Sequence, residues 1–70
     1  MQQKYIELNA FLKLKGLAST GGQAKQLIRS EAVLVNGEKE TRNKRKLLAG
    51  DKIIFKEKTY LVEQQMLKMG

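Results

Sequence analysis

Residues 20–40 read TGGQAKQLIRSEAVLVNGEKE, and within this stretch the pattern of apolar residues changes from helical to strand-like. Thr20 followed three residues later by Gln23 is a capping-box pattern, which predicts that a helix begins here. The helix is expected to run to about Ser30 or Glu31. The residues that it turns toward the core are Ala24, Leu27 and Ile28.

A β-hairpin is expected directly after this helix. The segment 33–35, Val-Leu-Val, is apolar and contains two β-branched valines, as strands often do. Asn36-Gly37 follows, and such a pair is the strongest two-residue signal of a hairpin turn. The chain then returns through Glu38-Lys39-Glu40. A helix followed by two paired strands is therefore the centre of the predicted fold.

A first helix is predicted on the N-terminal side of this stretch. Tyr5-Ile6 is expected to form a short opening strand, and helical spacing begins at about Leu8. The apolar stripe of the helix contains Leu8, Phe11, Leu12 and Leu14. Gly16 is expected to end the helix, because glycine takes the left-handed backbone conformation without steric cost. Two helices with so short a connection should pack as an antiparallel or steeply crossed pair.

The C-terminal half contains a loop, a second hairpin and a tail. Residues 41–46 are polar and basic and are expected to form the loop. Beyond them the predicted features are a turn at Gly50-Asp51, a strand over Lys52–Phe55, a turn around Glu57-Lys58 and a strand over Thr59–Val62. The tail, residues 63–70, is expected either to fray or to form a helical turn.

Two packed helices followed by a small, mostly antiparallel sheet make an α+β fold. The 70 residues are enough for one domain, 1–70, with a core at about 5–62. The hydrophobic fraction of 41% is too high for a disordered basic tail. The N-terminus lacks the apolar run of a signal peptide, no segment is long enough to span a membrane, and cysteine is absent. A cytoplasmic protein is therefore expected.

Catalytic and metal-binding residue types are scarce in this sequence. Histidine and cysteine are absent, which removes the commonest general base and the usual zinc and iron ligands. Asp51 lies in a turn, where its side chain is expected to bond its own backbone. The glutamates expected on the solvated surface are Glu31, Glu38, Glu40, Glu57 and Glu63. We therefore expect no enzymatic activity, no metal and no cofactor.

The predicted start of the second helix is a candidate anion site. The first amides of a helix have no intrahelical acceptor, and the helix dipole adds positive charge at this end. Gly21 and Gly22 lack Cβ atoms, so a phosphodiester can come close; alternatively, they only shape a tight turn. Lys25 and Arg29 stand four residues apart on one face, where their mutual repulsion favours an anionic partner.

Basic residues are in excess, with 14 lysines and arginines against 7 acids and a formal net charge of +7. This excess is either a general solubility charge or a match to an anionic partner, most often nucleic acid. A basic run contains Lys39, Arg42, Lys44, Arg45 and Lys46. The run is either a solvated loop or one wall of a groove, because the preceding hairpin folds it back toward the second helix. Asn36-Gly37 either makes only the hairpin turn or adds a contact with the partner at the rim of that groove.

Few aromatic residues are available to stack on bases. Phe11 and Phe55 are expected in the core, which leaves only Tyr5 and Tyr60. Proteins that bind single strands generally need several stacking platforms. Recognition through phosphates, 2′-hydroxyls and helix shape suits this chain better, so folded RNA is the favoured partner.

An ordered set of motifs covers nearly the whole chain. It consists of Phe11-Leu12-Lys13, Gly16-Leu17-Ala18-Ser19, Gln23-Ala24-Lys25-Gln26-Leu27-Ile28, Val33-Leu34-Val35-Asn36-Gly37, Leu47 and Gly50-Asp51. In these motifs the chain resembles the S-four domain family, also called the alpha-L RNA-binding motif. Its segments Thr20 to Lys25 and Glu40 to Leu47 look most like the stand-alone YaaA-like branch of bacterial proteins.

This resemblance implies a helix pair packed on a small bent sheet, with RNA bound across the second helix and adjacent loops. Many members of the family carry an arginine in the first turn of that helix, where this chain has Gly21, so only backbone amides are available there. The candidate RNA-binding residues are Lys13, Lys15, Thr20, Gly21, Gly22, Gln23, Lys25, Gln26, Arg29, Lys39, Arg42, Lys44, Arg45 and Lys46.

Three functions are compatible with the sequence. The first is non-catalytic binding of structured RNA, of the ribosomal or transfer RNA class, by a monomer that can associate with the ribosome and has no membrane partner. The second is a protein-interaction adaptor that uses the basic face and the apolar tail, residues 64–69. The third follows from charge alone and is binding of DNA or an anionic surface.

Overall fold

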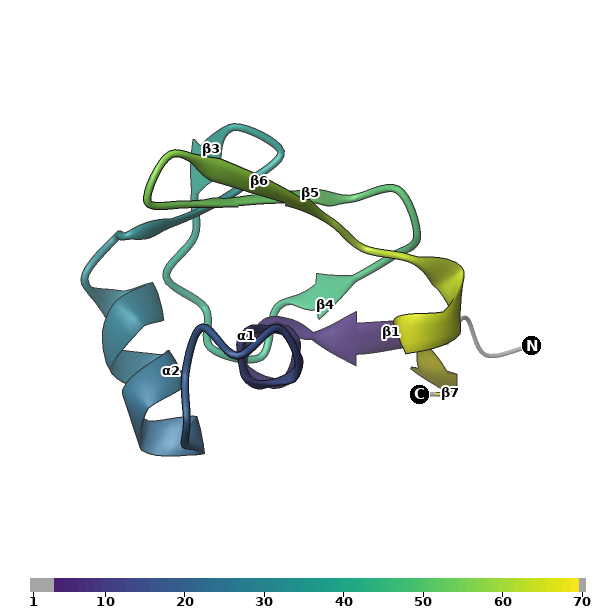
Figure 1. The fold of residues 1–70 in the computed structure, drawn as a ribbon, viewed down its shortest axis with the longest axis horizontal. Helices are drawn as coiled ribbons and strands as arrows, with labels where there is room; N and C mark the ends of the chain where they lie inside the picture. The colour runs from purple at the N-terminus through teal and green to yellow at the C-terminus, as the bar shows by residue number, and fades with distance from the viewer. Residues whose placement is uncertain (1–3, 70) are drawn as a thin grey trace.

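The structure of the protein is a computed structural model that describes residues 4–69 (Figure 1). Its elements are β1 (Lys4–Glu7), α1 (Leu8–Leu14), α2 (Gly21–Arg29), β2 (Val33–Val35), β3 (Glu38–Lys39), β4 (Lys46–Leu47), β5 (Lys52–Phe55), β6 (Lys58–Leu61), the 3₁₀ helix η1 (Gln64–Met66) and β7 (Lys68–Met69). No helix in this range is long and apolar enough to cross a lipid bilayer. The predicted α+β class, with two helices followed by antiparallel strands, is confirmed.

The strands form two small sheets. One has the order β4-β1-β7 and the other has the order β3-β2-β5-β6, and every pair is antiparallel. In Figure 1 the four-stranded sheet runs along one side of the molecule, the helices lie on the other side, and β1 lies next to α1. The core therefore lies between a helix pair and strands from both sheets.

Both helices and both sheets contribute to the core. The largest fully buried side chains are Phe11, Leu8, Leu12, Ile28, Leu47, Ile53, Val33, Val35 and Val62. Ala24 is buried and Leu27 packs at the edge, as predicted. The prediction for Leu14 is wrong, because 58% of this residue is exposed. At about 100° per residue, Leu14 lies about 160° around the helix from Leu12, so it faces away from the core.

A Schellman motif ends α1. The Gly16 N–H donates to the Lys13 carbonyl at 3.0 Å, and the Leu17 N–H donates to the Leu12 carbonyl at 2.9 Å. Gly16 has a φ of 74°, in the left-handed region that glycine adopts without steric cost. The predicted role of Gly16 is therefore confirmed.

The same motif ends α2, but with a glutamate in the left-handed position. The Glu31 N–H donates to the Ile28 carbonyl at 3.2 Å, and the Ala32 N–H donates to the Leu27 carbonyl at 3.4 Å. Glu31 has a φ of 65°, which is uncommon for a residue with a Cβ. The helix therefore ends at Arg29, within a residue or two of the prediction.

The two predicted hairpins are present. The β2–β3 hairpin turns at Asn36-Gly37, as predicted, with φ of 54° and 88°. The β5–β6 hairpin turns at Lys56-Glu57, with φ of 52° and 66°, one residue before the predicted position. Lysine and glutamate are not typical of positive φ. The sequence therefore has no local signal that fixes the exact position of the second turn.

Two short strands were not predicted. In β4, Leu47 pairs with Ile6, and in β7, Met69 pairs with Lys4, so β1 lies between them. The tail forms the turn η1 and then β7 instead of fraying, so the helical-turn alternative is confirmed. Residue 70, also part of the predicted tail, lies outside the described residues. Each unpredicted strand has two residues and depends on a partner distant in sequence, which a local pattern cannot show.

Candidate nucleic-acid interface

The start of α2 is capped by side chains from its own sequence. Thr20 has an extended backbone, and its Oγ1 accepts a hydrogen bond from the Gln23 N–H at 3.1 Å. Gln23 Oε1 accepts hydrogen bonds from the Ser19 N–H and hydroxyl, at 2.6 and 2.8 Å. Half of the predicted capping box is confirmed, and the return bond goes to Ser19 instead of Thr20. Thr20 and Gln23 therefore shape the helix start.

This cap leaves two amides free. Within the described range 4–69, the N–H groups of Gly21 and Gly22 have no acceptor in the protein, and no acidic residue lies in the first turn of α2. In α1, by contrast, the first two amides donate to carbonyls of the segment before β4. The start of α2 therefore exposes two donors at the positive end of its dipole.

The space around these two glycines is open. A Cβ added to Gly21 would have no heavy atom within 4 Å, and one added to Gly22 would meet only the Thr20 Oγ1, at 4.0 Å. Neither glycine has a positive φ. Packing and backbone conformation therefore do not require glycine at these positions, and the alternative that they only shape a tight turn lacks support.

Three polar side chains continue this surface along α2. Lys25, Gln26 and Arg29 are all exposed. Lys25 and Arg29 stand one helical turn apart, and neither forms an ion pair with another residue of the described chain. Both positive charges are therefore available to an anion from outside.

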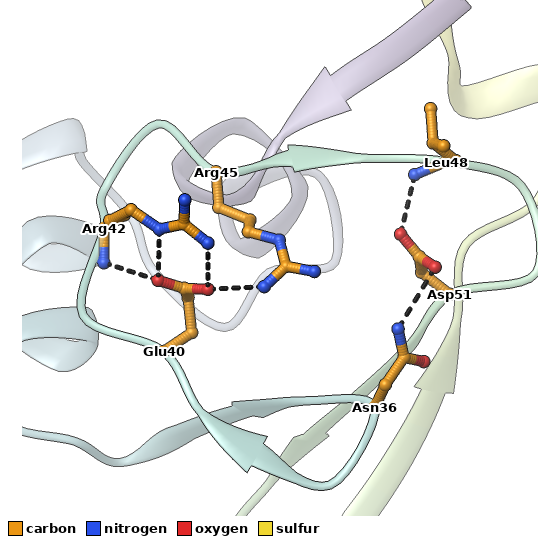
Figure 2. A network of polar contacts seen from close by, with 6 residues as sticks. All are labelled: Asn36, Glu40, Arg42, Arg45, Leu48 and Asp51. Carbon is orange, nitrogen blue, oxygen red and sulfur yellow. Dashed lines mark hydrogen bonds and ion pairs between the residues drawn. The ribbon is translucent and has the colours of Figure 1, made fainter.

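The segment 40–46, called the basic loop from here on, is organised around a buried acid (Figure 2). Only 6% of Glu40 is exposed. Its Oε2 accepts hydrogen bonds from the N–H and the Nε of Arg42, both at 2.9 Å. Its Oε1 accepts from Arg42 Nη2 at 3.1 Å and from Arg45 Nη1 at 2.6 Å. The prediction of a solvated Glu40 is wrong, because two arginines satisfy the buried carboxylate.

These hydrogen bonds keep Glu40 ionised. The Arg42 side chain is the main cause that lowers the pKa of the Glu40 carboxyl from 4.5 to about 2, and Arg45 adds to it, whereas desolvation opposes both. The carboxylate in turn raises the pKa of Arg42. The two guanidinium groups and the carboxylate therefore form a cluster with a net charge of +1.

The backbone of the basic loop is fixed on α1. The carbonyls of Arg45 and Asn43 accept hydrogen bonds from the Leu8 and Asn9 N–H groups, at 2.8 and 3.1 Å. The Arg45 N–H donates to the Arg42 carbonyl at 3.3 Å, which closes a turn. The loop is therefore held both by its backbone and by the buried carboxylate, unlike a loosely solvated charge run.

The cations of this region are partly brought together. Arg42, Lys44, Arg45 and Lys46 line one surface pocket. The Lys46 ammonium also lies 4.8 Å from the centre of the Tyr5 ring, within range of a cation–π interaction. Lys39 instead pairs with Glu31, with 3.6 Å between ammonium nitrogen and carboxylate oxygen. That pair ties the β2–β3 hairpin to the end of α2.

Asn36 and Asp51 serve the fold. Asn36 Oδ1 accepts from the Lys52 N–H at 3.0 Å. Its Nδ2 donates to Asp51 Oδ1 at 3.2 Å, as Figure 2 shows. Asp51 Oδ2 accepts from the Leu48 N–H at 2.8 Å, so it bonds turn backbone as predicted. The Asn36 side chain therefore forms its hydrogen bonds within the protein. This favours the alternative in which Asn36-Gly37 only makes the turn and does not contact a partner.

All but one of the candidate residues fall into three groups. The first is Lys13, exposed in the last turn of α1, with Lys15, which caps that helix, and neither lines the pocket of the basic loop. The second group is the start and exposed face of α2, and the third is the basic loop. Lys39 lies apart on β3, where it pairs with Glu31. Sequence reasoning missed Glu40. The available signal was a single acid inside a run of cations, two and five residues before arginines.

Comparison with known proteins relates this sequence to a family of small domains. The S4 domain model matches residues 1–63. "Probable ribosome maturation protein RlbA" of Bacillus subtilis (strain 168) is 46% identical over 46 residues, which cover 66% of this chain and 65% of that protein. "Putative RNA-binding protein YbcJ" of Escherichia coli (strain K12) is 41% identical over 51 residues, which cover 73% of each.

The chain therefore spans slightly less than two thirds of the Bacillus relative and more than two thirds of the Escherichia relative. The family match covers both helices, the basic loop and both hairpins. It confirms the resemblance to the S-four family that the sequence motifs indicated. This chain belongs to the S4 domain family.

Proposed function

We propose that this protein binds structured RNA without catalysing a reaction, as a cytoplasmic monomer, with ribosomal or transfer RNA as the target class. Membership of the S4 domain family and the name of the Escherichia relative support RNA binding. The name of the Bacillus relative refers to ribosome maturation, which supports a ribosomal target. The observation that carries the proposal is the open start of α2, where the amides of Gly21 and Gly22 have no acceptor among the described residues.

In this proposal an RNA phosphate accepts hydrogen bonds from those two amides. The missing Cβ atoms let the sugar–phosphate backbone approach, and the helix dipole favours the negative charge. Lys25 and Arg29 follow on the same helix and meet neighbouring phosphates. The basic loop supplies a second set of cations, which makes the interface broad enough for a folded RNA.

The few aromatic rings favour folded RNA over a single strand. Phe11 and Phe55 are buried in the core, as predicted. Tyr60 is half-buried, and the Tyr5 ring already meets the Lys46 ammonium. Within residues 4–69 no row of exposed rings is available for successive bases, so phosphates and helix shape are the features left to recognise.

The adaptor alternative loses its main support. Met66 and Leu67 of the apolar tail pack against the core, and β7 pairs with β1. A deletion of the tail would therefore disturb the fold as well as any partner contact, and the tail is not a free docking segment.

The proposal is tested by titrating a folded ribosomal RNA fragment and a transfer RNA at several salt concentrations. If about five phosphates are contacted, the logarithm of affinity should fall against the logarithm of salt with a slope between about −3 and −4.5. A duplex DNA of matched length is the control and should bind more weakly. A flat salt response, or equal binding of the DNA, would contradict the proposal.

A further inference from the structure

The basic loop contains an acid at a place where binding of a polyanion favours cations. By charge alone, Glu40 weakens the attraction between the loop and a phosphate backbone. Yet the carboxylate is buried and accepts four hydrogen bonds, all from Arg42 and Arg45. The geometry of these bonds indicates what the carboxylate contributes.

Both guanidinium groups are held by Glu40 and still keep free donors. Arg42 uses Nε and Nη2, and Arg45 uses Nη1 alone. In the described part of the chain, Nη1 of Arg42 and both Nε and Nη2 of Arg45 have no acceptor. Both arginines share Oε1, at 3.1 and 2.6 Å, so their planar groups lie next to each other (Figure 2).

The pair is also accessible from solvent. The side chain of Arg42 is 71% exposed and that of Arg45 is 30% exposed. A free arginine must give up rotamer freedom when it binds a phosphate, whereas a side chain that is already held has less freedom to lose. Without the carboxylate, two adjacent like charges would repel each other and separate.

We infer that Glu40 is a positioning residue for RNA recognition, which holds Arg42 and Arg45 side by side so that their free N–H groups receive a phosphodiester of a folded RNA. This inference rests on the proposed function. It makes an acidic residue necessary for tight binding of a polyanion. Charge counting makes the opposite prediction, because removal of an acid raises the net charge by one.

The variants Glu40→Gln and Glu38→Gln form a matched pair. Both remove one negative charge from neighbouring positions of the chain, but Glu38 is exposed and has no ion pair in the described part of the chain. Their affinities for the folded ribosomal RNA fragment are compared at one salt concentration. We expect Glu40→Gln to weaken binding about 5- to 10-fold, since two side chains must be ordered again. Glu38→Gln should bind as tightly as the unchanged protein, or slightly more tightly.

A second background separates positioning from a general effect on the fold. With Arg42→Ala present, Glu40→Gln should have a smaller effect on affinity, because one of the two groups that it positions is missing. The same loss in both backgrounds would overturn the inference. If circular dichroism shows that Glu40→Gln is unfolded, the variant Arg42→Lys is used instead. This variant keeps the positive charge but loses the two side-chain hydrogen bonds that Arg42 donates to the carboxylate. Its binding should weaken about threefold.

The outcomes for the two proposals differ. The inference about Glu40 is overturned if Glu40→Gln binds the RNA fragment as tightly as Glu38→Gln does. It is also overturned if Arg42→Lys binds that RNA as tightly as the unchanged protein does. In both cases the proposed function stands. If the unchanged protein shows no salt-dependent binding to folded RNA, the proposed function itself fails.

Discussion

Ionisation of Glu40 contributes to the stability of the fold. Its carboxyl has a pKa of about 2 in the folded protein against an ordinary 4.5, so the unfolded chain binds the proton more readily. The stabilisation is therefore complete above about pH 4.5 and is lost as the pH falls toward 2. We expect the free energy of unfolding to fall by on the order of 2 kcal/mol across this window. This value is smaller than the full pKa shift implies, because solvent screens the exposed Arg42 side chain.

Thermal melts followed by circular dichroism between pH 4.5 and 2 would check this expectation. The variant Glu40→Gln is the control, because it cannot titrate at this position. It should be less stable than the unchanged protein at neutral pH, and the two melting temperatures should converge as the acid window is crossed. A constant difference between them at every pH would assign the acid sensitivity to other carboxyls.

Glu31 offers a second test at the scale of one residue. It holds a left-handed backbone position with a φ of 65°, where glycine is free of steric cost. Its ion pair with Lys39 is exposed on both sides and contributes little. We expect Glu31→Gly to raise the stability by about 0.5–1 kcal/mol, measured by chemical denaturation. Glu31→Ala keeps the strain and loses the ion pair, so it should bring no gain.

At the scale of the element, the two helices use their N-terminal amides differently. The start of α1 is closed by carbonyls of the basic loop, whereas the start of α2 is open and begins with two glycines. An open helix start with glycines gives up helix propensity, which an alanine would restore. The two glycines instead leave room at the backbone for a ligand, at a cost in helix propensity.

The variant Gly22→Ala separates these two effects. A Cβ fits the free protein, with Thr20 Oγ1 at 4.0 Å as its nearest neighbour. We expect stability to rise by about 0.5 kcal/mol and the affinity for folded RNA to fall about threefold or more, since about 0.7 kcal/mol corresponds to threefold. Glu31→Gly is the control, because it stabilises the other end of the same helix and, since it removes an acid and frees Lys39, should not weaken the affinity. Equal affinity of both variants would remove the start of α2 from the interface.

At the scale of the whole molecule, the proposed function requires α2 and the basic loop to contact one RNA at the same time. Lys25 lies on α2 and Lys44 lies in the basic loop, and both are exposed. We expect Lys25→Ala and Lys44→Ala each to make the slope of the logarithm of affinity against the logarithm of salt shallower by about 0.7–0.9. The double variant should show the sum of the two changes. The measurement is the salt titration of binding to the folded ribosomal RNA fragment.

Lys58→Ala provides the matched control, since it removes the same charge from an exposed position on β6. It should leave the slope unchanged. If the double variant of Lys25 and Lys44 has no larger effect than one of the single variants, then only one of the two groups contacts the RNA.

Much of this fold was predictable because strong local signals coincide with it. Gly16, Thr20 and Asn36-Gly37 occupy the predicted positions at a helix end, a helix start and a turn. The turn at Lys56-Glu57 was predicted one residue too late, and the left-handed Glu31 was not predicted, because their residues do not favour the conformations they hold. At the turn, the pairing of Phe55 with Lys58 imposes the backbone conformation. At Glu31, the hydrogen bonds that close the end of α2 impose it.

The candidate site was predictable in composition but not in organisation. The cations of the basic loop and the glycines of α2 could be identified directly from the sequence. The buried state of Glu40 could not, because it depends on two arginines that fold back onto one carboxylate. The fixation of the loop on α1 was equally hidden, since it uses backbone carbonyls, which every residue type has.

The position of β1 has a consequence for the order in which the fold assembles. This strand is the middle strand of its sheet, and its neighbours β4 and β7 come from the second half of the described residues. Its pairings therefore join residues that are distant in sequence, and such contacts form slowly because a long loop must close first. The two helices are joined by a short connection, so we expect the helix pair to form early and the sheet around β1 to close after it.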